Sequence, residues 1–265
     1  LNVEDLCEAP RYNEFSREMF DMVMDAAQKL AEKELAPTNT DGDTKGVKLQ
    51  DGQVTVPESF HAAYQRYCEG GWASLPISQE MGGQGFPSVI YVATMELFVA
   101  ANQALMMYPG LTIGAARLIE LYGTEEQQRM YMDSMYTGEF CGTMCLTEPQ
   151  AGSDVGALRT KAVKRPDGTY SIQGGKIFIS AGDHDLTENI IHMVLARVEG
   201  APAGTKGISI FIVPKKRFEN GEWVDNDVVC MATEKKMGIH GSATCALNFG
   251  EKDNCIGYLL GEENM

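Results

Sequence analysis

The feature that most constrains the fold of this chain is a change of hydrophobic period near residue 140. In residues 13–36, apolar side chains recur at helical spacing, with Phe15, Met19 and Met22 on one face. After residue 140, apolar and polar residues alternate, which is the pattern of half-buried strands. The sequence therefore predicts an α+β chain in which the helices come first and the strands follow.

This change divides the chain into a helical domain, residues 1–137, and a β domain, residues 138–257, and we expect residues 258–265 to begin a linker to a further domain. Many short strands separated by turn residues are typical of an antiparallel β-barrel or sandwich, which we expect for the second domain. Turn signals such as Pro166-Asp167-Gly168 support this expectation. The predicted strands are 140–147, 159–164, 169–174, 176–180, 190–198, 208–213, 228–234 and 244–250.

Caps and helix breakers place the helices of the first domain. Pro37 ends the first helix, and residues 38–55 are polar, so we predict a loop there with at most a short hairpin. Ser88 caps a nearly all-apolar helix, which is expected to be buried and to break at Pro109-Gly110. The predicted helices are 13–36, 57–69, 89–107, 112–122 and 124–136.

Composition limits the classes of function. The net charge of −15 argues against nucleic acid as a partner and disfavours a polybasic membrane anchor. No run approaches the roughly 20 apolar residues that span a bilayer, so no membrane span is expected. No basic segment followed by an apolar stretch opens the chain, and seven scattered cysteines favour reduced thiols. These features predict a cytoplasmic location.

Several tempting motifs have simpler interpretations. Residues 82–85 are glycine-rich, but no strong strand leads into them, so we favour a turn over a phosphate loop. Cys141 and Cys145 share one face of a predicted strand and are expected to pack in the core, because a metal site lacks further ligands nearby. The sequence thus predicts no metal site.

The histidines and two lysines are also weighed against simpler roles. His184 follows Asp183, yet adjacent residues seldom face one another, so we expect a solvated loop histidine rather than a catalytic dyad. His192 is expected to be structural, and His240, in a glycine-flanked turn, is the candidate for a ligand contact. Lys235 and Lys236 are expected to be solvated, with phosphate contact as the alternative.

Residues 145–160, CLTEPQAGSDVGALRT, join a predicted strand to a turn of small and polar residues. Because Pro149 follows Glu148, the chain must leave the strand in an extended conformation. Gly152 allows close approach of a ligand, and Ser153 supplies a hydroxyl. Physics alone gives two interpretations of equal weight, an anion-binding strand exit and a turn with an Asx or Ser cap.

The same stretch contains TEPQAGSD, which resembles the flavin-binding signature of the acyl-CoA dehydrogenase family. The segment 176–180, KIFIS, resembles the second flavin segment of that family, and residues 236–244 resemble its late hairpin. The run KIFISAGDHDLTENI is most similar to the branch that includes 3-methylmercaptopropionyl-CoA dehydrogenase. The resemblance is strong over residues 76–250.

The resemblance implies FAD as cofactor and an acyl-CoA substrate. Thr147 would bond near N1 of the flavin ring, and Ser153 would bond the pyrophosphate and lie near the acyl-CoA. Phe178 would cover the ring, and Ser180 would reach its N5 edge. The implied cofactor contacts are Met144, Leu146, Thr147, Gly152, Ser153, Phe178, Ile179 and Ser180.

Without the family resemblance, the residue types favour purely structural roles for Thr147, Ser180 and Phe178. The hydroxyls of Thr147 and Ser180 would satisfy local backbone groups, and Phe178 would be a core residue. The chain also departs from the family, which commonly has an aromatic residue at Met144, Trp at Phe178 and Thr at Ser180. Serine keeps the hydrogen bond but lacks the methyl group that stiffens the side chain. These departures put flavin affinity and substrate fit in question.

In this family a glutamate of a later helical domain removes the substrate α-proton, while hydride leaves the β-carbon for the flavin. No residue of this chain matches that base, and we expect the C-terminal helical bundle to be absent and the fragment alone to be inactive. The implied partners are an electron-transfer flavoprotein and further copies in a homodimer or homotetramer. The alternatives are a non-catalytic flavin- or acyl-CoA-binding fragment and an acyl-CoA oxidase.

Overall fold

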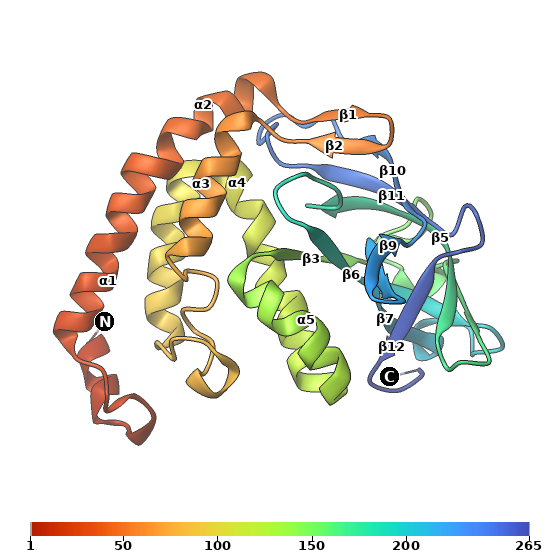
Figure 1. Ribbon diagram of the computed structural model, residues 1–265, viewed down its shortest axis with the longest axis horizontal. Coiled ribbons are helices and arrows are strands. Elements are labelled where there is room, and N and C mark those ends of the chain that lie inside the picture. Colours follow the sequence, from red (N-terminus) through yellow and green to blue (C-terminus); the bar gives the residue numbers. More distant parts are fainter. Residues whose placement is uncertain (1, 265) are drawn as a thin grey trace.

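A computed structural model describes residues 2–264, with helices on one side of the molecule and strands on the other (Figure 1). The last long helix ends at Thr137 and the first strand of the large sheet begins at Phe140, where the hydrophobic period changes. The helices are α1 (Arg17–Leu30), α2 (Ala36–Lys45), α3 (Glu58–Glu69), α4 (Ser88–Tyr122) and α5 (Glu125–Thr137).

The helical part differs from prediction at residues 38–55. Helix α1 continues through one π-helical turn, Ala31–Leu35, into α2, so residues 38–45 are helical and the predicted loop is wrong there. Tertiary contacts override the weak local propensity. Thr38 is buried, and its hydroxyl accepts a hydrogen bond from Asn102 Nδ2 at 2.8 Å. The remaining residues form a short hairpin of β1 (Lys48–Gln50) and β2 (Gln53–Thr55).

Helix α4 runs through Pro109, so the predicted break there is also wrong. The helix bends instead at Asn102, whose φ of −155° and ψ of 89° are not helical. The Asn102 side chain accepts a hydrogen bond from the Leu105 backbone N–H at 3.0 Å, as an N-cap does. Asn102 therefore starts a second helical segment, and Pro109 lies inside it.

Among residues 2–264, α4 alone is long and apolar enough to cross a membrane by length and composition. This corrects the statement that no run reaches that length. The apolar character of α4 has a local explanation, because the helix packs against α1, α2, α5 and the strand β3. The helix is only partly buried, however, because Val92 and Leu121 are exposed, so the expectation of a helix buried all round is met in part.

The large sheet has the strand order β10-β11-β5-β12-β7-β6-β3, with β4 paired to both β5 and β6. The sheet is mixed, which corrects the expectation of a purely antiparallel domain: β3 and β4 each run parallel to β6. A parallel pair needs a long connection, and some 40 residues separate β3 from β6. Closure into a barrel stays a prediction. The large-sheet strands are β3 (Phe140–Cys145), β4 (Lys161–Lys164), β5 (Tyr170–Ser180), β6 (Asn189–Val198), β7 (Ile208–Pro214), β10 (Val228–Thr233), β11 (Thr244–Phe249) and β12 (Ile256–Leu260).

Two predicted strands, 169–174 and 176–180, are one strand, β5. Gly174 and Gly175 do not turn the chain, because both pair with β11. The hairpin of β8 (Lys216–Glu219) and β9 (Glu222–Asp225) was not predicted, and neither was β12. The two hairpin strands are short and mostly exposed, so they lack the alternating pattern that reveals a strand.

Specific contacts fix the helical part against the β part. Tyr108 of α4 donates its hydroxyl to the carbonyl of Gly241 at 2.8 Å and accepts from the N–H of Ala243 at 2.9 Å. A Cβ added at Gly241 would lie 2.7 Å from the ring of Phe60 and 2.9 Å from Gly42 Cα. The loop before β11 is thus held tightly between α2, α3 and α4.

We predict that Gly241→Ala destabilises the protein by about 1–3 kcal/mol, because the new methyl group overpacks this junction. Thermal unfolding measures the effect. The matched control is Gly238→Ala in the same loop, since no atom lies within 4 Å of a Cβ placed there. Equal melting temperatures for the two variants would show that the junction accommodates the added methyl group without loss of stability.

Candidate functional site

The exit of strand β3 and the end of strand β5 lie side by side. The backbone N–H of Ile177 donates to the carbonyl of Thr147 at 2.9 Å. The ammonium of Lys176 donates to the carbonyl of Leu146 at 3.1 Å. The two segments singled out in the sequence, 145–160 and 176–180, are therefore brought together by hydrogen bonds between their backbones and one side chain.

A buried ion pair lies at this junction. Lys176 Nζ is 2.8 Å from Glu148 Oε1, and the two side chains are 0% and 3% exposed. The carboxylate also accepts hydrogen bonds from the N–H of Arg159 at 2.6 Å and from the N–H and hydroxyl of Thr160 at 3.0 and 2.6 Å. Both oxygens of Glu148 are thus occupied by donors of the protein itself.

The protonation states of this pair follow from its surroundings. Burial alone raises the pKa of the Glu148 carboxyl, but the hydrogen bonds from Lys176, Thr160 and Arg159 outweigh burial and lower the pKa to about 2. Burial lowers the pKa of Lys176, and the contact with Glu148 partly offsets that effect. Sequence reasoning placed Lys176 in a flavin segment but missed its partner, which lies 28 residues away.

The predicted hydroxyl groups are accessible at this junction. Thr147 and Ser180 are half-buried, and Ser153 and Gly152 are exposed. Within residues 2–264, no hydrogen bond occupies the side-chain oxygens of Thr147, Ser153 or Ser180. Three hydroxyls with no protein partner thus remain available to a ligand, and the blander roles for Thr147 and Ser180 find no support.

The apolar members of the predicted set differ in placement. Met144 and Leu146 are half-buried. Ile179 is only 2% exposed, so its side chain belongs to the core and any ligand contact would use its backbone. Phe178 is 58% exposed, which contradicts the alternative that it is a core residue.

The backbone at Phe178 is strained. Its φ is +59°, a value that residues other than glycine seldom adopt. The pairing of β11 with β5 shifts register between Cys245 and Leu247, directly opposite this residue. Such bulges re-aim side chains next to functional sites, and here the bulge accompanies an aromatic ring exposed to solvent.

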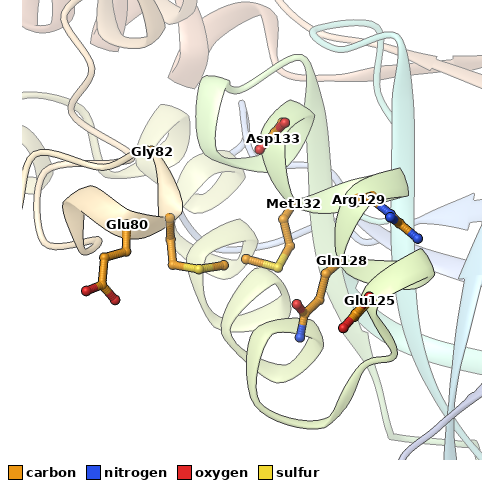
Figure 2. A pocket seen from close by; sticks show the side chains of 8 residues that line it. Glu80, Gly82, Glu125, Gln128, Arg129, Met132 and Asp133 are labelled. Atoms are coloured by element: carbon orange, nitrogen blue, oxygen red, sulfur yellow. The ribbon is translucent and has the colours of Figure 1, made fainter.

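The glycine-rich residues 82–85 form the turn that the sequence predicts. The backbone N–H groups of Gly83 and Gln84 donate to the carbonyls of Ser78 and Ser74, at 3.0 and 3.1 Å, so they are not available to a phosphate. Gly82 borders a hollow of about 400 Å³ between this turn and α5, shown in Figure 2. None of the predicted site residues lines that hollow.

The histidines need one correction. His184 is 4% exposed and stacks edge-on against Tyr108 with ring centroids 4.9 Å apart, so it is not a solvated loop residue. Burial lowers its pKa to about 3. His192 is structural, as expected, with Nδ1 2.8 Å from the hydroxyl of Thr143.

His240 is the predicted ligand contact, but both of its ring nitrogens already have hydrogen-bond partners in the protein. Its Nδ1 lies 3.0 Å from the Asp43 carbonyl and its Nε2 lies 2.8 Å from the Lys236 carbonyl. Lys236 is half-buried and donates to the Ser242 carbonyl at 2.8 Å, whereas Lys235 is exposed, as expected. In the part of the chain that the structure describes, all seven cysteines are free, and no cluster suited to a metal ion occurs.

The fold and the junction match one family. Residues 17–139 match the family model described as acyl-CoA dehydrogenase, N-terminal domain, and residues 143–251 match acyl-CoA dehydrogenase, middle domain. Together these matches cover most of the chain, which belongs to the acyl-CoA dehydrogenase family. A helical N-terminal domain followed by a β-rich middle domain is the fold seen here.

Individual relatives agree. The chain is 44% identical over 232 residues to 3-methylmercaptopropionyl-CoA dehydrogenase of Ruegeria pomeroyi, covering 87% of this chain and 39% of that protein. It resembles an acyl-CoA dehydrogenase from Bacillus anthracis solved in complex with FAD (TM-score 0.72, 25% identity, 95% of this chain and 38% of that one). It also resembles a chain in a structure described as the electron transferring flavoprotein of Acidaminococcus fermentans (TM-score 0.71, 30% identity, 94% and 60%). The chain spans about two fifths of the length of the first curated relatives it matches.

We predict that the ionisation of Glu148 makes the free energy of unfolding depend on pH between 4.5 and about 2. Its folded-state pKa of about 2 lies below the ordinary 4.5, so the stabilisation is complete above pH 4.5 and is lost as pH falls toward 2. Within that window one proton contributes a slope of up to ~1.4 kcal/mol per pH unit. Chemical unfolding at several pH values should show a shallower slope for Glu148→Gln than for the parent. Identical slopes would contradict the assigned pKa.

Proposed function

We propose that this chain forms the N-terminal and middle part of an FAD-dependent acyl-CoA dehydrogenase. The observation that carries the proposal is the junction of the two segments 145–160 and 176–180, which are joined through Thr147 and Ile177. At that junction the chain presents hydroxyls without protein partners beside an exposed aromatic ring. A planar, hydrogen-bonding ligand such as a flavin suits this surface.

The residues present fit FAD. Thr147 offers a hydroxyl just after β3 and Ser180 offers one at the end of β5, and Phe178 offers a ring face that solvent reaches. Ser153 follows Gly152 in an exposed loop, where a phosphate can approach the backbone closely. The Bacillus anthracis enzyme that this chain resembles was solved with FAD, which supports the same assignment.

Each side chain has a distinct role in the proposed site. Thr147 would bind the N1 side of the ring and Ser180 the N5 edge, while Phe178 would cover the ring against water. Ser153 binds the pyrophosphate and borders the acyl-CoA. When bound, FAD supplies the hydride acceptor for dehydrogenation of the α,β bond of the thioester. These side chains orient the ring and shield it.

The proton acceptor does not come from this junction. A general base must reach the proton it removes and must bind that proton in turn. Glu148 does neither, because its oxygens are occupied and its pKa is about 2. We propose that the base belongs to a C-terminal helical domain of the whole protein, as the family resemblance implies.

The remaining assignments extend the same proposal. The substrate is an acyl-CoA with a short or sulfur-bearing chain, in line with the name of the Ruegeria pomeroyi relative. The electron acceptor is an electron-transfer flavoprotein, and the whole enzyme is a homodimer or homotetramer in the cytoplasm. Dehydrogenation is favoured over oxidase activity because the relatives from Ruegeria pomeroyi, Syntrophomonas wolfei and Mycobacterium tuberculosis are named dehydrogenases.

The first test is flavin retention. We expect the purified chain, mixed with FAD and passed through a desalting column, to keep the visible absorption bands of bound flavin. Ser153→Ala should weaken binding by roughly 1.5–3 kcal/mol, the contribution of a hydrogen bond to a charged group. Ser134→Ala on α5, outside both segments, is the control. Parent-like retention by Ser153→Ala would remove its proposed role.

The second test needs the chain joined to the C-terminal part of the whole protein. We expect Ser180→Ala to slow flavin reduction by an acyl-CoA more than it weakens substrate binding, because charge changes at N5 in the transition state. Stopped-flow absorbance separates the two quantities. An unchanged rate with a raised dissociation constant would place Ser180 in substrate binding instead.

A further inference from the structure

The junction depends on a lysine that the proposed flavin contacts do not use. Lys176 precedes Ile177 in β5, and its side chain is fully buried. Its ammonium has two partners, the Leu146 carbonyl at 3.1 Å and the Glu148 carboxylate at 2.8 Å. Both partners come from the opposite segment. The Lys176 side chain therefore binds the first segment at Leu146 and Glu148, the two residues that flank Thr147.

Stability alone does not account for this arrangement. A buried ion pair seldom stabilises a fold more than apolar residues of the same volume, whereas removing one partner is costly. The Glu148 carboxylate has other donors: the side-chain amide of Gln150, the N–H groups of Arg159 and Thr160, and the hydroxyl of Thr160. Arg159 and Thr160 lead into β4, which pairs with the earlier part of β5, residues 170–173. Lys176 is the side chain that reaches this carboxylate from the end of β5, so its particular effect is on the spacing between the two segments.

We propose that Lys176 and Glu148 are positioning residues that couple the two flavin-contacting segments. The pair sets the separation between Thr147, two residues after β3, and residues 178–180 at the end of β5. Loss of the ammonium releases the Leu146 carbonyl and weakens the adjacent bond from Ile177 to Thr147. This inference rests on the proposed function for its ligand, FAD, and on the geometry of the chain alone for the coupling.

The test variant is Lys176→Met, which keeps an unbranched side chain and removes the charge. Two quantities are measured on the 265-residue chain: the dissociation constant for FAD, and the hydrogen-exchange rate of the Ile177 amide without FAD. We expect each to rise about tenfold or more.

The chain offers a matched control. Lys215 forms an ion pair with Asp183, whose carboxylate is 3% exposed, and neither residue belongs to the two segments. Lys215→Met should lower the melting temperature as a lost ion pair does, but it should leave FAD affinity and Ile177 exchange at parental values. This control separates positioning from general destabilisation.

The outcomes are distinct. If Lys176→Met and Lys215→Met change FAD affinity equally, or if Ile177 exchange stays at the parental rate in Lys176→Met, the coupling is refuted. If the parent binds no FAD, the proposed function fails, yet Ile177 exchange still decides the coupling. Should Lys176→Met not fold, Glu148→Gln/Lys176→Met removes both charges together. Faster exchange at Ile177 in that variant supports the coupling, and parental exchange refutes it.

Discussion

The site depends on one buried contact, the ion pair between Glu148 and Lys176. A lysine ammonium with no exposure needs partners, and this one finds a carboxylate and a carbonyl on the neighbouring segment. Those partners tie a turn rich in small residues to the end of a long strand. The turn is also held by its own backbone, since the N–H and carbonyl groups of Glu148 and Ala151 bond each other at 3.0 Å. The ion pair adds the connection between this turn and the end of β5.

Helix α4 of the helical domain holds strand β3, the strand that leads into this site. The N–H of Gly142 in β3 donates to the hydroxyl of Thr112 in α4 at 3.0 Å. A Cβ added at Gly142 would lie 2.6 Å from Ala115, so only glycine lets the strand approach the helix this closely. On its other side β3 pairs with β6. Strand β3 therefore delivers Leu146 and Thr147 from a position fixed by both domains.

The sequence predicted well what depends on local pattern and failed where distant contacts decide. The change of period located the transition from helices to strands, and the fixed spacing of TEPQAGSD identified the segments that meet at the junction. The helical state of residues 38–45 depends on contacts such as Asn102 to Thr38, 64 positions apart. The burial of His184 depends on Tyr108, and the role of Lys176 on Glu148. Neither periodicity nor a family signature reveals such pairs.

The central claim is that the junction held by Glu148 and Lys176 binds FAD, and a crystal structure of this chain grown with FAD tests it most directly. The account predicts the flavin ring against Phe178, with the hydroxyls of Thr147 and Ser180 within hydrogen-bonding distance of its edge. Flavin bound elsewhere, for example in the hollow beside α5 shown in Figure 2, with this junction empty, would contradict it.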